Sequence, residues 1–348
     1  MIDVEFPHII FNETLSSYKN GFNHGREFSQ AIAELSQIRR GLLIQRSPHL
    51  KENINSLAQD QFNETKAFDN ELSEELRGIS DGSGCPIEDI IIINNYTDFR
   101  DINLPEEGCS TIGVNTEQRL SGQTWDMHST AKNYVCIIEN PGKWTVFSLV
   151  GCLGMMGANK DSLFVGVNNM NTTDAKPGIV WPAFVRKSLQ KKNVEEVMIL
   201  AKSTSFTGAH NYLFSDLLGS RHQEISPTRN ETASEFKNKG TIFHTNHCLT
   251  AGLIEIEEKL SVNSTSKERF KLLESAVPKI NTEMELIELL QSHEGYPKSI
   301  CGHFQSGAQD PSITCGGGVF NHETKDFFFW RGCPKEDSTY KEIKIKLS

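Results

Sequence analysis

Cys109 is the residue whose type and position best suit chemistry, because it follows Gly108 where helical patterning gives way to strand-like patterning. Gly108 has no side chain, so a nucleophile can approach its carbonyl and its backbone tolerates strain. Attack of the Cys109 thiol on that carbonyl would form a thioester, and hydrolysis would release a new N-terminal Cys109. A buried strand cysteine is the commoner role for this residue type, but the junction with Gly108 favours the reactive role.

The α-amine freed by such a cleavage can serve as the catalytic base. A free α-amine has a reference pKa of about 7.7–8.0, against about 8.5 for a thiol. The amine can therefore take the thiol proton near neutral pH without a histidine. The sequence thus predicts an amide-bond hydrolase or acyltransferase in which Cys109 supplies both nucleophile and base.

The composition limits the class of protein and the kind of partner. The chain has 348 residues, 37% of them hydrophobic and 23% charged, as in soluble globular proteins. A net charge of −10 makes nucleic acid and anionic membranes poor partners. No apolar run approaches the roughly 20 residues that a membrane span needs. We expect a small-molecule substrate, with no nucleic acid and no membrane.

The cysteines and the chain ends bear on the compartment. The eight cysteines are scattered, which is not the density of a disulfide scaffold, so we expect mostly small buried hydrophobes in a reduced, intracellular protein. Residues 1–5 show no secretory signal, and the ending Lys346-Leu347-Ser348 has the residue types of a Ser-Lys-Leu peroxisomal signal in the wrong order. We predict a cytoplasmic protein and keep the peroxisome as the alternative.

Periodicity predicts a helical first part and a mixed second part. Apolar residues recur at helical spacing over 18–43 and 57–79, a glycine stop ends at Gly84, and a short helix begins at Pro86. After Gly108 we predict strands at 110–114, 134–138, 144–150, 163–167, 212–215 and 241–244, and from Gly122 onward. Helices are predicted at 182–189, 194–202, 268–277 and 283–293, and a hairpin at 312–320 and 327–330. This order predicts an α+β sandwich of sheets covered by helices.

Six segments in order carry a resemblance to a known family. They are Gly21-Phe22-Asn23-His24-Gly25-Arg26, Glu74-Glu75-Leu76-Arg77-Gly78-Ile79-Ser80-Asp81-Gly82, Gly108-Cys109-Ser110-Thr111, Gly122-Gln123-Thr124-Trp125-Asp126, His244-Thr245-Asn246-His247 and Ser299-Ile300-Cys301. Over most of its length the chain resembles the acyl-coenzyme A:isopenicillin N acyltransferase family, cysteine members of the N-terminal nucleophile hydrolases. The resemblance implies a four-layer αββα sandwich. It also implies cleavage into a helical segment, 1–108, and a nucleophile-bearing chain, 109–348, that together form one domain.

The resemblance also assigns roles to individual residues. Cys109 would be the nucleophile, and Asp126 would hold and orient its freed amine. Asn246 would donate its side-chain amide to the oxyanion, a contribution worth roughly 3–4 kcal/mol. The backbone around Asn168 resembles the second donor position, with Asn169 adjacent. Taken without the resemblance, Asp126 and Asn246 also fit ordinary turn positions at strand ends.

Other candidate sites have weaker support. His244, His247 and Cys248 include zinc-ligand types, but we see no partner pair at zinc spacing, so we expect no metal and no cofactor. The run 316–318 of glycines lacks the Lys-Ser/Thr of a phosphate-binding loop, and we predict a strand bulge. The basic positions 186, 187, 191 and 192 could meet coenzyme A phosphates, but a solvated helix end is the favoured interpretation.

The predicted reaction is hydrolysis or transfer of the acyl group of a small N-acyl amine, with acyl-CoA as a further substrate. Many relatives carry a basic residue directly after Ser-Ile-Cys, where this chain has Gly302, which leaves the acceptor and acyl-chain specificity open. One alternative is a hydrolase of β-alanyl-amine conjugates. Another is a scaffold that keeps the fold and never cleaves itself.

Overall fold

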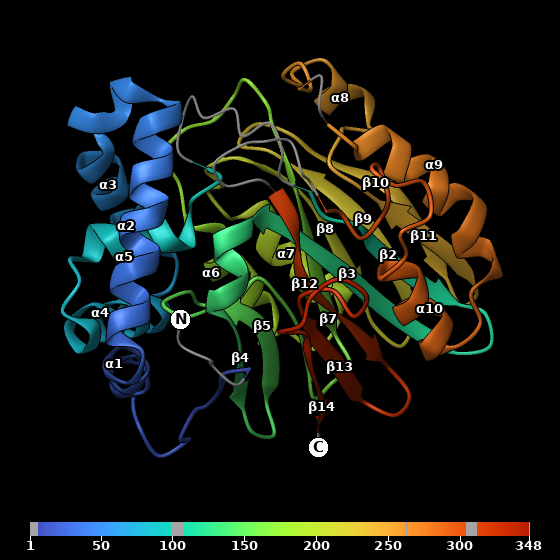
Figure 1. Cartoon of the computed structure of the whole chain (residues 1–348), viewed down its shortest axis with the longest axis horizontal. Helices are drawn as coiled ribbons and strands as arrows, with labels where there is room; N and C mark the ends of the chain where they lie inside the picture. The colour runs from blue at the N-terminus through green and yellow to red at the C-terminus, as the bar shows by residue number, and fades with distance from the viewer. Residues whose placement is uncertain (1–5, 99–107, 262–263, 304–311, 348) are drawn as a thin grey trace.

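Two β-sheets lie face to face at the centre of the molecule, and helices cover their outer faces (Figure 1). The computed structural model describes residues 6–98, 108–261, 264–303 and 312–347. The larger sheet has the strand order β1-β4-β5-β6-β7-β8-β9-β10, and the smaller has the order β11-β2-β3-β12-β13-β14. Strands β2 and β3 of the smaller sheet face β7 and β8 of the larger sheet. The predicted four-layer αββα sandwich is confirmed.

The strands of the larger sheet are β1 (His8–Ile10), β4 (Val135–Asn140), β5 (Trp144–Leu149), β6 (Met156–Asn159), β7 (Phe164–Met170), β8 (Ala209–Ser215), β9 (Gly219–Ile225) and β10 (Asn230–Lys237). Those of the smaller sheet are β11 (Gly240–His244), β2 (Thr111–Asn115), β3 (Arg119–His128), β12 (Ser312–Asn321), β13 (Asp326–Arg331) and β14 (Lys341–Lys346). The predicted hairpin is confirmed as β12 and β13. The register shift between Thr314 and Gly316 confirms the predicted bulge.

The helices divide between the two outer faces. They are α1 (Ser17–Glu27), α2 (Ser29–Arg46), α3 (Ile54–Phe68), α4 (Asn70–Ser83), α5 (Ile87–Asn94), α6 (Trp181–Ser188), α7 (Val194–Lys202), α8 (Ala251–Ile254), α9 (Ser266–Ala276) and α10 (Glu283–Leu290). Helices α2 to α7 share one apolar core with the larger sheet, whereas α9 and α10 form a second core with the smaller sheet. Burial of these two apolar faces is the main stabilisation of the four layers.

The prediction of a single helix over 18–43 is wrong. The chain forms α1 and α2 instead, because the backbone of Phe28 leaves the helical region at φ −109°, ψ 24°. The stretch over 57–79 is likewise divided. Asp69 ends α3 and caps α4 by accepting a hydrogen bond from the backbone N–H of Leu72 at 3.0 Å. A carboxylate at this position satisfies an orphan N–H of the first turn, so the local cap outweighs the continuous apolar pattern. The stop at Gly84 is confirmed, with φ at 74°.

Close packing of α1 on α4 explains two of the sequence motifs. A Cβ atom on Gly21 would lie 2.2 Å from the carbonyl oxygen of Glu75, and one on Gly78 would lie 2.1 Å from that of Tyr18. Only glycine permits this approach of two backbones. The two motifs before residue 84 therefore act through helix packing on the N-terminal side of the fold.

Several short strands went unpredicted, namely β1, β6, β9, β10 and β14. In β10 the burial alternates between exposed and half-buried residues, because it lies at the edge of its sheet. An edge strand with one wet face carries few apolar residues, so hydrophobic periodicity misses it. The segment 99–107 before the predicted cleavage site, the ends 1–5 and residue 348 lie outside the described residues.

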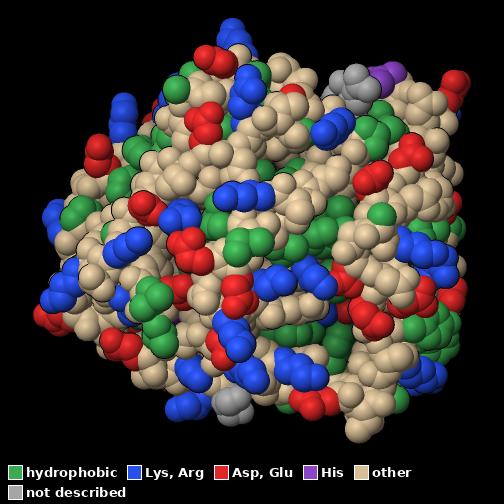
Figure 2. All heavy atoms as spheres, turned by 180° about the vertical axis from the view of Figure 1, so that it is seen from behind, with side chains coloured by type: hydrophobic (Ala, Val, Ile, Leu, Met, Phe, Trp, Pro, Cys, Tyr) green, Lys and Arg blue, Asp and Glu red, His purple; other side chains and the backbone are tan. Residues whose placement is uncertain are grey.

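The surface of the molecule is mixed in charge on the face turned away from the view of Figure 1. On that face acidic and basic side chains are interspersed, and hydrophobic side chains gather in the middle (Figure 2). This face therefore has no single-sign field of the kind that attracts a polyanion. Within the described ranges, no helix has both the length and the apolar character that a membrane crossing requires.

Candidate active site

Cys109 lies just before β2 and lines a pocket. The pocket takes residues from both sides of the Gly108–Cys109 junction, including Tyr96 from the first part and Trp181 from the second. Gly108 and Asp126 lie on its wall as well.

Strand register brings Asp126 and Asn246 to Cys109 from either side. On one side β2 pairs with β3, and the pairing extends past the strand so that Gly108 opposes Asp126, whose backbone N–H donates to the Gly108 carbonyl at 2.7 Å. On the other side β2 pairs with β11, where Thr111 opposes His244. Counting outward from that antiparallel pair places Asn246 beside Cys109.

The junction is closely packed around Gly108. A Cβ atom at residue 108 would lie 2.6 Å from Oδ2 of Asp126 and 2.8 Å from Nη2 of Arg269. A larger residue at position 108 would have to displace one or both of these side chains. The close approach also places a carboxylate and a guanidinium directly against the peptide that is predicted to be cut.

The backbone of Cys109 is held by side chains from three different elements. Its N–H donates to Oδ1 of Asn246 at 2.8 Å. Its carbonyl oxygen accepts from Nδ2 of Asn168 at 2.9 Å and from Nη1 of Arg269 at 2.7 Å. These bonds fix the residue on both sides of its Cα atom, so the thiol is carried on a rigid support.

Asn168 is oriented by its own neighbours. Its Oδ1 accepts hydrogen bonds from Thr111 Oγ1 at 2.6 Å and from Asn211 Nδ2 at 2.7 Å. The remaining side-chain donor must then face the Cys109 carbonyl. This side-chain bond is separate from the oxyanion donor predicted on the backbone around Asn168, which stays a prediction.

Asn246 presents its oxygen to Cys109 and its nitrogen elsewhere. Oδ1 accepts from the Cys109 N–H and from Nη2 of Arg269 at 2.7 Å, and Nδ2 donates to the carbonyl oxygen of Asn169 at 3.0 Å. An amide nitrogen carries two protons. One donation to Asn169 leaves a second proton for an oxyanion, and the Asn169 backbone joins the same network.

Asp126 is buried, and burial raises the pKa of its carboxyl to about 6, against the opposing effects of Arg269, Thr314 and His303. Thr314 opposes Asp126 in the pairing of β12 with β3, and its hydroxyl donates to Oδ1 at 2.7 Å. A carboxylate in a low-dielectric site is destabilised unless a cation is present. The site is thus suited to hold an ammonium group beside Asp126.

Arg269 is the functional residue that sequence reasoning missed. It lies on α9, is buried, and also donates to Oγ of Ser110 at 3.0 Å. A sequence signal exists, because Ser266, Arg269 and Leu273 occupy the buried face of α9 at helical spacing. A basic residue on such a face is rare unless it is paired.

The weaker candidates have other partners. His244 contacts Oε1 of Glu224 through Nε2 at 2.8 Å, and His247 contacts Oγ of Ser266 through Nδ1 at 2.8 Å.

For the basic residues 186, 187, 191 and 192 a solvated helix end was predicted. This is wrong for Arg186, which is buried and forms a paired contact with Glu75 at 2.9 Å. Lys187 Nζ lies 2.6 Å from Asp69 Oδ2 on α3's boundary.

The chain is similar in sequence to known acyltransferases. The sequence profile described as "Acyl-coenzyme A:6-aminopenicillanic acid acyl-transferase" matches residues 114–323, which begin after Cys109 and include Asp126, Asn168, Asn246 and Arg269. A relative from Emericella nidulans, the 40 kDa form of acyl-coenzyme A:6-aminopenicillanic-acid-acyltransferase, is 25% identical over 315 residues, covering 87% of this chain and 86% of the relative.

Two solved structures were also similar. A variant of conjugated bile acid hydrolase from Clostridium perfringens has 12% identity and a TM-score of 0.41, covering 68% of this chain and 92% of that one. Penicillin V acylase from Agrobacterium tumefaciens has 14% identity and a TM-score of 0.38, covering 69% and 86%.

The αββα layers and the cysteine held at the edge of a central strand define an N-terminal nucleophile-type fold, and the protein is an enzyme that acts on amide-type acyl groups. The chain belongs to the acyl-coenzyme A:6-aminopenicillanic acid acyl-transferase family.

Proposed function

We propose that this enzyme cleaves itself between Gly108 and Cys109 and then hydrolyses or transfers the acyl group of a small N-acyl amine or an acyl-CoA. The observation that carries the proposal is the convergence of Asp126, Asn246 and Arg269 on the Gly108–Cys109 peptide. Each of these groups contacts the backbone that would be cut or the residue that would be freed.

Self-cleavage would proceed by an acyl shift. The Cys109 sulfur attacks the Gly108 carbonyl carbon, the C–N bond breaks, and the thiol proton passes to the departing amine. Water then hydrolyses the thioester and leaves Gly108 with a free carboxylate. Asp126 supports both steps, because its pKa of about 6 leaves it ionised near neutral pH and able to stabilise the new ammonium group.

Turnover would use the same groups in new roles. The free amine takes the thiol proton, and the thiolate attacks the substrate carbonyl. The leaving group is the amine of the substrate, or the thiol of coenzyme A, and it departs with the proton that the α-amine of Cys109 took up. Water or an acceptor amine then attacks the thioester and releases Cys109. Asn246 would stabilise the oxyanion through its second N–H, while Arg269 and Asn168 hold Cys109 in place.

The pocket favours an apolar substrate group. Its apolar lining includes the side chains Ile93, Tyr96, Trp125, Met127, Met155, Val167 and Trp181. A charged β-alanyl ammonium group would lose its hydration there. This lining supports an N-acyl compound with an apolar acyl group over the β-alanyl alternative.

The N-terminal segment would remain part of the enzyme after cleavage. Arg39, Ile93 and Tyr96 from that segment line the pocket. Its helices also bury apolar residues in the same core as the larger sheet. Separation of the two chains would expose that core, so we expect them to stay associated.

Intact mass spectrometry of the purified full chain tests the proposal. Wild type should separate under denaturing conditions into 1–108 and 109–348, whereas Cys109→Ala should remain one chain. Cys85→Ser, which alters a cysteine outside the pocket, should cleave normally. Complete cleavage of Cys109→Ala would disprove the mechanism, and an uncleaved, inactive wild type would support the scaffold alternative.

Activity of the cleaved enzyme then identifies the substrate class. A panel of N-acyl amines, acyl-CoAs and β-alanyl amides should give the fastest turnover with apolar acyl groups. Preference for the β-alanyl amides would overturn the assignment of the acyl group while leaving the processing result intact.

A further inference from the structure

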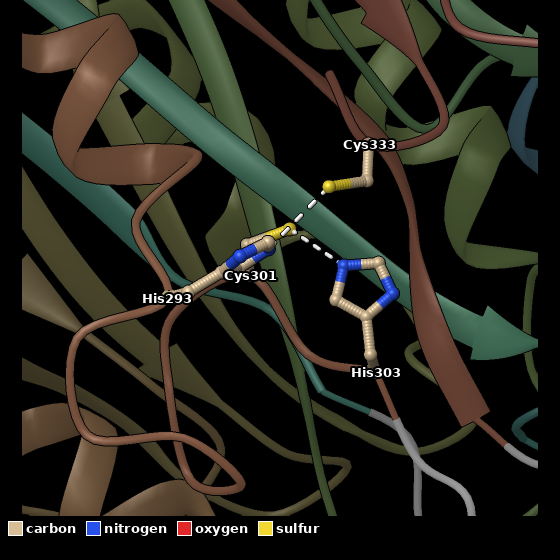
Figure 3. A group of neighbouring side chains, drawn as sticks. All are labelled: His293, Cys301, His303 and Cys333. Atoms are coloured by element: carbon tan, nitrogen blue, oxygen red, sulfur yellow. Dashed lines mark hydrogen bonds between the residues drawn. The ribbon is translucent and has the colours of Figure 1, made fainter. Parts of the chain in front are cut away.

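A second cluster of reactive side chains lies apart from the residues that hold Cys109. His293, Cys301, His303 and Cys333 each offer one ligand atom, and all four atoms lie within 4.8 Å of one another. Figure 3 shows the four side chains pointing toward a common centre; Cys301 and His303 share one segment, and His293 and Cys333 come from two others. Two histidines and two cysteines are a standard ligand set for structural zinc.

The spacing of the atoms fits a tetrahedral metal site. Cys301 Sγ lies 3.4 Å from Nε2 of His303, and Cys333 Sγ lies 3.4 Å from Nε2 of His293. Bond lengths of about 2.3 Å for Zn–S and about 2.0–2.1 Å for Zn–N give a sulfur–nitrogen edge of about 3.6 Å in a tetrahedron. The two rings also lie at 89° to each other with their centroids 4.9 Å apart.

The surroundings support the same assignment. The Nδ1 atoms of His293 and His303, on the far sides of the rings, lie 4.0 Å and 3.8 Å from the carboxylate of Glu336. Metal-binding histidines commonly direct the second ring nitrogen toward a carboxylate. The backbone N–H of Lys335 donates to Cys333 Sγ at 3.4 Å, which stabilises a thiolate.

We propose that His293, Cys301, His303 and Cys333 bind one zinc ion with a structural role. Two thiolates balance the charge of Zn²⁺, and soft sulfur with imidazole selects zinc over magnesium or calcium. Four protein ligands fill a tetrahedral shell and leave no open position for a substrate. This site revises the expectation of no metal, which rested on ligand spacing along the sequence.

The zinc would fix a loop that supports the active site. Gly302 lies between two of the ligands, and its N–H donates to Oγ1 of Thr314 at 2.8 Å. The same hydroxyl donates to Asp126 at 2.7 Å. Metal binding therefore holds the segment that orients the hydroxyl against the Asp126 carboxylate, although the metal itself takes no part in the reaction.

Metal analysis of the purified full chain tests the site. Wild type should contain about one zinc per chain, and so should Cys109→Ala, because the site is independent of self-cleavage. Cys333→Ser and His303→Gln should each lose most of the zinc, whereas Cys85→Ser should retain it. Metal-free wild type loaded with Co²⁺ should show thiolate-to-cobalt charge-transfer absorption that disappears in Cys333→Ser.

The same experiments can also contradict the zinc proposal. Zinc-free wild type that fails to take up added Zn²⁺ in reducing buffer would overturn the proposal. So would peptide mapping that finds a Cys301–Cys333 disulfide in the native protein, since oxidised sulfurs cannot ligate. Zinc retained at wild-type level in both ligand variants would show that the metal binds elsewhere. Because wild type itself is measured, misfolding of a variant cannot hide the answer.

Discussion

Replacing Asp126 by Asn should stabilise the uncleaved chain while impairing its function. Burial raises the pKa of this carboxyl from an ordinary 3.8 to about 6, and that value already includes the attraction of Arg269. One pKa unit corresponds to about 1.36 kcal/mol, so keeping the carboxylate ionised costs the folded chain about 3 kcal/mol near pH 7. Asparagine keeps the shape and the acceptor for Thr314 but removes the charge.

The sign follows from proton linkage. A carboxyl whose pKa is raised by folding favours the native state below pH 3.8, and this contribution is lost as the pH rises through about 6. The two pKa values imply a cost of about 3 kcal/mol near pH 7 and about 1 kcal/mol near pH 4.5. The gain in the free energy of unfolding that Asp126→Asn produces should therefore be about 2 kcal/mol smaller near pH 4.5 than near pH 7.

Denaturant unfolding of Cys109→Ala, with and without Asp126→Asn, measures this difference at both pH values. Asp174→Asn in the same background is the matched control. Hydrogen bonds from Thr228, Thr172 and Ser226 outweigh burial and lower the pKa of Asp174. Its replacement should destabilise the chain near pH 7 and less so in acid, the opposite sign to Asp126.

A pH-independent destabilisation by Asp126→Asn would refute the reasoning, because the charge would then carry no burial cost. Self-cleavage and turnover are measured with Asp126→Asn in a chain that keeps Cys109. There Asp126→Asn should slow self-cleavage and turnover far more than it alters folding. Normal turnover with an unchanged pH–rate profile would show that Asp126 does not hold the amine.

Four further substitutions test other contacts. Asn246→Ala should fold and yet lose roughly 10²–10³-fold in turnover, measured on cleaved enzyme, and near-normal turnover would place the oxyanion donor elsewhere. Arg269→Lys keeps the charge but loses the branched guanidinium that joins the Cys109 carbonyl to Asn246. Processing and turnover should therefore fall roughly 10–10²-fold, with the melting temperature less affected. Unchanged rates would exclude a positioning role. Gly78→Ala should destabilise the fold by about 1–3 kcal/mol in denaturant melts, because the new Cβ meets a backbone carbonyl at 2.1 Å. Gly41→Ala, where nothing lies within 4 Å, should instead stabilise by about 0.5–1 kcal/mol, and equal effects at the two glycines would contradict the packing argument.

Local pattern was enough to predict sheets covered by helices, whereas the four-layer order came from the family resemblance and the reactivity of Cys109 stays a prediction. Helical spacing before residue 84 and strand-like runs after Gly108 reflect which face of each element meets the core, and that information is contained in short windows. Where a local cap competes with periodicity, as at Asp69, the prediction of helix boundaries failed.

The chemistry around Cys109 could be predicted only in part. Asp126 and Asn246 were identified through a resemblance, but their meeting depends on how β3 and β11 pair with β2. Register sets which residues oppose one another, and it is decided by packing of the whole sheet. The direction of the Asn246 amide follows from the donors around it, so it could not be predicted from residue type.

Arg269 and the proposed zinc ligands were decided by tertiary structure alone. Arg269 is separated from Cys109 by 160 positions that include strands and helices, and Cys333 from His293 by 40 positions that include β12 and β13. Short-range spacing reveals a site only when its ligands share one turn or hairpin. Here separate segments supply the groups, and the stacking of layers, driven by burial of their apolar faces, brings the groups together.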